Sequence, residues 1–283
     1  MTKKIVFGNF KGGVGKTTNS VMFAYEAAKL GKKVLLCDLD PQANSTQMLN
    51  RTYTRQNNSE MPNEKTMMVA IQEEDLSSAV VEVMPNLFLL PSHLDFVDYP
   101  DFIELVYPTT LENFKEKRIA HFGSLLKEIE NDYDLVIIDC PPTISLYTNT
   151  ALYTADFLII VLQTQQRSLD GAEAFWEYAQ TFYNKYTNAD FDIAGVLPVL
   201  MKNDSGIDNQ IIKDALDSFG EKYVFTHIVK HMERLKGYDR KGIADKDYTA
   251  TWDYHDIKLH EFYAEITEEF LQRIGEQNHG KTI

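Results

Sequence analysis

Residues 3–18 read KKIVFGNFKGGVGKTT, and this stretch decides the fold. Its first eight residues form a short, largely apolar segment rich in β-forming residues and bounded by glycine, which is typical of a buried strand. A glycine-rich loop follows, and from Thr17 to Leu30 apolar residues recur at helical spacing until Gly31. Residues 32–40, KKVLLCDLD, predict a second buried strand. Strand, loop, helix and strand form a βαβ unit, so the two strands should be parallel.

The same alternation continues through the rest of the chain. Near-continuous apolar runs predict strands at 87–92, 133–139 (ending at Asp139 before two prolines), 156–163, 191–200 and 221–229. Amphipathic patterns predict helices at 119–132, 169–186, 207–220 and 256–274. We therefore expect a three-layer α/β fold, with a mostly parallel, doubly wound sheet and helices on both faces. No linker or internal repeat divides residues 1–283, so a single domain is expected, with a polar exposed loop at about 50–65.

The composition limits the classes of function. With 44% hydrophobic residues the chain can bury a core, and no apolar run is long enough to span a membrane. The two cysteines, Cys37 and Cys140, lie inside apolar runs, which favours buried free thiols in a reducing compartment. These features favour a soluble, cytoplasmic protein. The net charge of −14 means that any nucleic-acid binding must come from a local basic patch.

The glycine loop matches most of the phosphate-loop pattern G-x-x-x-x-G-K-[ST]. Gly15, Lys16 and Thr17 fit its second half, but Phe10 stands at the first glycine position. Glycines allow backbone N–H groups to turn towards phosphate oxygens, and the N-terminus of the following helix favours an anion. An ordinary glycine turn is the alternative. The required strand and helix on either side favour a P-loop NTPase, in which Lys16 would reach the β- and γ-phosphates and the Thr17 hydroxyl would bind Mg²⁺.

Residue by residue, KGGVGKTT at 11–18 resembles the deviant Walker A motif of the ParA/MinD family of ATPases. DLDPQANST at 38–46 and DLVIIDCPP at 134–142 are similar to the second signature and the Walker B strand of that family. The resemblance covers residues 3 to about 245, is weakest from 50 to 115, and is strongest to partition ATPases of the Soj type. Because the first strand begins at residue 3, we expect no N-terminal helix-turn-helix domain.

The resemblance implies a function and its partners. It implies slow, Mg²⁺-dependent ATP hydrolysis by a homodimer that closes over two ATP molecules. The dimer would bind DNA non-specifically on the nucleoid, and a ParB-like centromere-binding protein would stimulate hydrolysis in plasmid or chromosome partition.

The resemblance also implies roles for individual residues. The early lysine, Lys11, would cross the dimer interface to the partner's phosphates, much as an arginine finger does. Lys16 and Asp40 would complete the catalytic set, with Asp40 orienting the attacking water. Thr17, Asp38 and Asp139 would hold Mg²⁺, the two aspartates acting through its waters. The nucleotide would contact Lys11, Gly12, Gly13, Val14, Gly15, Lys16, Thr17, Thr18 and, at the adenine, Asn203.

Each of these roles has a structural alternative. Lys11 also fits a solvated loop lysine, and Asp38 or Asp40 fits the start of a turn before Pro41. Asn203 is a residue type that loops favour in any case.

A local basic patch lies between Lys230 and Lys246, where six basic residues outnumber three acidic ones. It overlaps the region where the family binds DNA, so the resemblance implies phosphate contacts that are sequence-independent and salt-sensitive. The sequence HMERLKGYDRK departs from the usual family block here, and a solvated face of mixed charge is the alternative. The DNA-contact candidates are Lys230, Arg234, Lys236, Arg240 and Lys241.

Three other functions use the same type of loop or fold, and the sequence disfavours each. A MinD-like ATPase that docks on membrane needs a basic amphipathic helix at its C-terminus, but the end of this chain is rich in glutamate. An iron–sulfur reductase of the nitrogenase iron-protein type needs cysteines at cluster positions, which Cys37 and Cys140 do not occupy. A nucleotide-gated regulator with little turnover is disfavoured because both lysines and all three aspartates are present.

Overall fold

An eight-stranded sheet forms the centre of the computed structural model, which describes residues 1–62, 65–201, 206–247 and 252–277. The strands lie in the order β3-β4-β2-β5-β1-β6-β7-β8, and every neighbouring pair is parallel except β3 and β4. They are β1 (Lys3–Gly8), β2 (Val34–Asp38), β3 (Val81–Met84), β4 (Leu87–Leu90), β5 (Leu135–Asp139), β6 (Phe157–Gln163), β7 (Asp192–Met201) and β8 (Val229–Lys230).

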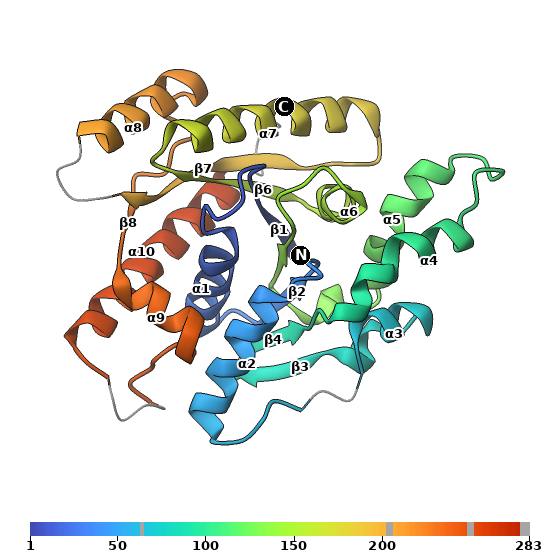
Figure 1. Cartoon of the computed structure of the whole chain (residues 1–283), viewed down its shortest axis with the longest axis horizontal. Helices are drawn as coiled ribbons and strands as arrows, with labels where there is room; N and C mark the ends of the chain where they lie inside the picture. Colours follow the sequence, from blue (N-terminus) through green and yellow to red (C-terminus); the bar gives the residue numbers. More distant parts are fainter. Residues whose placement is uncertain (63–64, 202–205, 248–251, 278–283) are drawn as a thin grey trace.

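Helices cover both faces of this sheet (Figure 1). One face carries α1 (Lys16–Lys29), α2 (Asn44–Asn57), α9 (Glu233–Lys241) and α10 (Tyr254–Gln277). The other carries α3 (Met67–Gln72), α4 (Tyr99–Val106), α5 (Phe114–Leu126), α6 (Leu146–Thr154), α7 (Gln166–Lys185) and α8 (Gly206–Phe219). Short 3₁₀ turns lie at Leu76–Ala79, Leu94–Asp98 and Glu130–Asp132. The predicted α/β class and doubly wound sheet are confirmed.

Alternation along each strand builds the two halves of the core. In β1, Ile5 and Phe7 belong to the core under α1, whereas Val6 between them belongs to the core on the other face of the sheet. Successive side chains of a strand point to opposite faces, so an apolar run is needed where both faces are covered. None of the described helices is long and apolar enough to cross a bilayer.

Strand register gathers the motifs at one edge. β5 lies between β1 and β2, and Asp139 at its end pairs with Phe7 of β1 and with Asp38 of β2. The carboxyl ends of these three parallel strands therefore meet, and the glycine loop, the DLD sequence and the two prolines leave the sheet side by side. Open α/β sheets bind ligands at this edge.

The polar segment expected to be a loop at 50–65 is helical as far as Asn57, and this part of the prediction is wrong. Helix α2 buries only a narrow stripe that includes Met48, Leu49 and Thr52, and the rest of its surface faces solvent. With so few apolar positions, the sequence of this helix lacks a clear amphipathic pattern and resembles that of a polar loop. The expected C-terminal helix at 256–274 lies within α10.

The last predicted strand is also mostly absent. Of residues 221–229, only Val229 belongs to a strand, and Val224 makes an isolated bridge to β7. The chain leaves the sheet at Thr226 and His227, whose backbone N–H groups donate to the carboxylate of Glu269 on α10 at 2.9 and 3.2 Å. The Glu269 side chain, 43 residues away in sequence, therefore accepts the Thr226 N–H in place of a carbonyl group from a neighbouring strand.

Candidate nucleotide site and basic groove

The glycine loop joins β1 to α1 and has the backbone that a phosphate cradle needs. Gly13 and Gly15 adopt φ values of 73° and 90°, in a region that glycine enters without the steric cost that a side chain adds. Lys16 at the start of α1 is 7% exposed, and its ammonium group donates to the main-chain oxygen of Lys11 at 3.4 Å. Burial lowers the pKa of Lys16, although nearby anionic groups, among them Asp139, act against that shift.

The start of the loop is anchored to the neighbouring elements. The side chain of Asn9 donates to the main-chain oxygens of Val161 and Ser168 and accepts from the N–H of Lys11 at 2.7 Å. Gly171 of α7 packs so closely here that an added Cβ would lie 2.8 Å from Asn9 Oδ1. The position of Lys11 is therefore set by β6 and α7. Within the described residues, its ammonium group makes one hydrogen bond, to the Gly12 oxygen at 3.5 Å.

Two buried carboxylates stand opposite the loop. Asp38 accepts from the N–H and hydroxyl groups of Thr46 at 2.9 and 2.8 Å, and Asp139 accepts from the Ser45 hydroxyl at 2.5 Å. Burial raises the pKa of both groups, and the Asp139 carboxylate raises that of Asp38 further. Two neighbouring buried anions are costly unless a cation balances them.

One oxygen atom of the Asp38–Asp139 pair indicates that the site suits Mg²⁺. Asp139 Oδ1 is buried and has no hydrogen-bond partner among the described residues, although Oδ2 of the same carboxylate is satisfied. Buried polar atoms are rarely left unpaired, so an unpaired one beside a phosphate loop suits a metal-bound water. The donor set of carboxylates with the Thr17 hydroxyl consists of hard oxygens, which Mg²⁺ prefers.

Asp40 lies at the mouth of the same site. Its carboxylate accepts from the N–H of Gln42 at 2.9 Å, and its own N–H donates to Asp38. Burial raises the pKa of Asp40, while the Gln42 N–H and the Lys16 charge lower it.

A cavity of about 540 Å³ joins these groups. The glycine loop with Lys16, Thr17 and Thr18 forms one wall, and Asp40, Cys140 and Pro142 lie across from it. Gln47, Met48 and Arg51 of α2 and Asp239 of α9 form the remaining wall. The geometry thus brings together the predicted Lys16, Thr17, Thr18 and Asp40, next to Asp38 and Asp139. Asn203 lies outside the described residues.

A family model described as an AAA domain matches residues 2–193 of the chain. The chain belongs to this AAA-domain family. It is 28% identical to the sporulation initiation inhibitor protein Soj of Bacillus subtilis over 250 residues, 82% of this chain and 86% of that protein. It is 29% identical to the chromosome-partitioning ATPase Soj of Thermus thermophilus over 277 residues, 97% of each chain.

Two solved structures share the fold of this AAA-domain protein. A Cyanothece McdA–ATP complex superposes with a TM-score of 0.76 at 20% identity, covering 96% of both chains. A Mycobacterium smegmatis cobyrinic acid a,c-diamide synthase with bound ADP and magnesium superposes with a TM-score of 0.69 at 24% identity, covering 85% of this chain and 92% of the other. The resemblance is confirmed: the chain is a ParA/MinD-type P-loop ATPase related to the partition ATPases.

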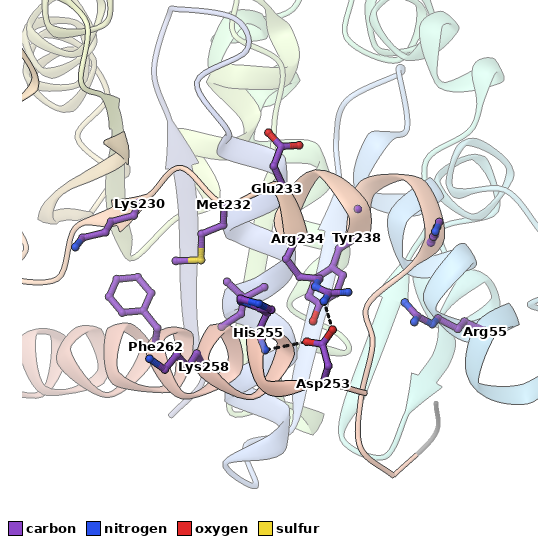
Figure 2. Close-up of a pocket in the computed structure, with 13 residues that line it drawn as sticks. Arg55, Lys230, Met232, Glu233, Arg234, Tyr238, Asp253, His255, Lys258 and Phe262 are labelled. Atoms are coloured by element: carbon purple, nitrogen blue, oxygen red, sulfur yellow. Dashed lines mark hydrogen bonds and ion pairs between the residues drawn. The ribbon is translucent and has the colours of Figure 1, made fainter. Parts of the chain in front are cut away.

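The predicted basic patch of this ATPase borders a second, larger cavity of about 1100 Å³ between α9 and α10 (Figure 2). Lys230, Arg234 and Lys241 line this groove, whereas Lys236 and Arg240 are exposed on α9 outside it. Two of the predicted residues are already paired. Arg234 binds Asp253 and the buried Asp256, and Lys236 lies 3.0 Å from Glu233.

The groove also has basic residues that the sequence did not indicate. Arg55 reaches it from α2, and Lys258 and His255 reach it from α10. Similarly, Ser45 and Thr46 lie within the quoted DLDPQANST signature, but no role was predicted for them. Arg51 and Asp239 form part of the remaining wall of the nucleotide cavity. No sequence motif indicates them, because this wall forms only when α2 packs against α9.

Proposed function

We propose that this ATPase moves DNA in partition, by closing as a homodimer over two ATP molecules and binding DNA non-specifically in that state. Hydrolysis, stimulated by a ParB-like centromere-binding partner, would then open the dimer and release the DNA. The names of the Soj relatives support the partition role. The observation that carries the proposal is the cavity lined by the buried Lys16 and by Asp40, with the buried Asp38 and Asp139 next to it and a second lysine, Lys11, in the same glycine loop.

In this proposal the loop binds ATP through its backbone and through Lys16. The N–H groups from Gly12 to Thr18 would hold the phosphates, and Lys16 would reach the β- and γ-phosphates. Burial lowers the pKa of Lys16, but the anionic groups beside it favour its charged form. Mg²⁺, held by Thr17 directly and by Asp38 and Asp139 through water, would neutralise charge on the phosphate oxygens.

Asp40 would position the water that attacks the γ-phosphate. Its carboxylate lies on the cavity wall opposite the loop, and the Gln42 N–H fixes its orientation. Phosphoryl transfer needs mainly positioning and charge compensation, so a carboxylate held in place can act without a large pKa shift.

Lys11 would act on the other subunit. Within the described residues no carboxylate lies within 4.0 Å of its ammonium group, and the anchored loop start leaves this charge at the exposed rim of the site. A γ-phosphate brought to that rim by a second copy would supply the missing anion. ATP would then favour the dimer, and loss of the γ-phosphate would weaken it.

The groove between α9 and α10 would take the DNA backbone. Lys230, Lys241 and Lys258 line it together with Arg55, so a chain with net charge −14 offers a local cationic surface. Contacts of this kind are made to phosphates and carry no sequence information. We further propose that residues 1–283 act as one ATPase domain in the cytoplasm, on the nucleoid and not on a membrane.

The test is the size of the protein in solution with a non-hydrolysable ATP analogue, with ADP and without nucleotide. We expect dimer only with the analogue, and monomer in all three conditions for Lys11→Ala. Lys213→Ala, on the exposed surface of α8, is the matched control and should behave like the parent. A parent protein that stays monomeric when saturated with the analogue would remove the proposal.

A further inference from the structure

Helix α9 borders both cavities. Arg234, Tyr238 and Lys241 line the basic groove, and Asp239, next in sequence to Tyr238, lines the nucleotide cavity. Any ligand contact at Asp239 therefore acts on the helix that carries part of the groove.

Asp239 is held at the end of the nucleotide cavity by two neighbours. The Thr18 hydroxyl donates to its carboxylate, at 3.3 Å to Oδ1 and 3.5 Å to Oδ2. Arg51 of α2 donates to its main-chain oxygen and, through its other terminal nitrogen, to Gln47 Oε1 at 3.2 Å. All four residues line the cavity, so this cluster forms one wall of it.

The position of the cluster along the cavity indicates which part of a nucleotide it would meet. Lys16, Thr17 and Asp40 mark the end that takes the β- and γ-phosphates. Thr18, the next residue of α1, also lines the cavity, and we infer that the nucleoside extends past it, away from Lys16. A carboxylate repels phosphate but accepts hydrogen bonds, and a ribose offers two hydroxyl donors. Acidic side chains recognise ribose hydroxyls in this way in dinucleotide sites.

We propose that the Asp239 carboxylate accepts a hydrogen bond from the ribose of the bound nucleotide, and that this contact couples nucleotide binding to the position of α9 and hence to the basic groove. This inference rests on the proposed function. It assigns Asp239 as a residue that selects ribonucleotides over deoxyribonucleotides. Arg51 is a positioning residue, because it holds the main chain of Asp239 against α2.

The first test needs only the parent protein. We expect at least one of 2′-deoxy-ATP and 3′-deoxy-ATP to bind about tenfold more weakly than ATP, the effect of losing a hydrogen bond to a charged acceptor. Tripolyphosphate, which has no ribose, measures the phosphate end alone. Equal affinities for ATP and both deoxy analogues would overturn the inference and leave the proposed function intact. A parent that does not bind ATP would overturn both.

The second test compares Asp239→Ala, which removes the acceptor, with Asp217→Ala, a matched change at an exposed carboxylate of α8 outside both cavities. Asp239→Ala should bring the affinities for ATP and the deoxy analogue to within about twofold of each other, with tripolyphosphate affinity not reduced. It should also reduce the gain in DNA affinity that ATP produces, while DNA binding without nucleotide is retained. If Asp239→Ala keeps the ATP preference of the parent and its full ATP-dependent gain, the inference is wrong.

Discussion

At the scale of single residues, the nucleotide cavity and the buried groups next to it carry charges that a bound ligand would balance. Asp38 and Asp139 are buried neighbours with raised pKa values, and Lys16 is a buried cation beside them. Each would be costly alone, and paired charges with additional hydrogen bonds reduce that cost. A Mg²⁺–nucleotide complex brings both the cation and the anion that this set lacks.

Lys16→Ala should weaken nucleotide binding. The change deletes a buried charge that, in the proposed function, would meet the phosphates, so we expect ATP affinity to fall at least about tenfold, the effect of losing a charge-assisted hydrogen bond. Titration with a fluorescent ATP analogue measures this, with Lys213→Ala as the control of equal charge change. Unchanged affinity would show that the phosphates do not bind at this loop.

Asp40→Ala should separate binding from turnover. Because Asp40 faces the cavity but does not belong to the phosphate cradle, ATP affinity should stay within a few-fold of the parent while the hydrolysis rate drops about 100-fold or more. Dimer should then accumulate with ATP itself. Steady-state phosphate release and size measurement test both, and parental turnover would exclude Asp40 from catalysis.

At the scale of elements, the sequence predicts contiguous units such as the βαβ unit well. It predicts poorly where a side chain from a distant part of the chain replaces the hydrogen bonds of a strand. The βαβ unit follows from residues 3–40 alone, because its strand, loop and helix signals are contiguous. Helix α2 was missed since its buried stripe is narrow. Most of the last strand is absent because Glu269 accepts the N–H groups of Thr226 and His227. No pattern within residues 221–229 could indicate that Glu269, so far along the chain, accepts these N–H groups.

The same carboxylate gives the junction before β8 a pH-dependent stability. Burial alone would raise the pKa of Glu269, but hydrogen bonds from Thr226, His227 and Arg273 outweigh it and lower the pKa to about 2, from an ordinary value of 4.5. Since the folded-state pKa is the lower one, the stabilisation is complete above about pH 4.5 and is lost as the pH falls towards 2.

Glu269→Gln should therefore lower the free energy of unfolding by about 1–2 kcal/mol at pH 7, and by progressively less as the pH falls through 4. Denaturant unfolding at pH 7, 5 and 3.5 measures the difference. Glu268→Gln, at an exposed neighbour on α10, should be close to neutral throughout. A difference between Glu269→Gln and the parent that does not change with pH would contradict the assigned role.

At the scale of the whole molecule, one basic groove stands out against an acidic total. Its cationic residues come from α2, β8, α9 and α10, so the groove exists only in the folded chain, and the sequence could indicate just the contiguous part between 230 and 246. The fold also changes which residues should be tested. Arg234 and Lys236 are paired with carboxylates, whereas Lys230 and Lys241 line the groove itself.

The double change Lys230→Glu with Lys241→Glu should weaken binding to random-sequence duplex DNA in the presence of a non-hydrolysable ATP analogue. Each lost phosphate contact should reduce the slope of log affinity against log salt by about 1, so a drop of about 2 is expected. Lys185→Glu with Lys213→Glu changes the net charge equally at exposed positions on α7 and α8, away from the groove. If both double variants weaken binding to the same extent, DNA senses only the total charge of the molecule, and the groove is not its site. A reduced slope confined to the groove variant, with dimer formation intact, would place the phosphates between α9 and α10.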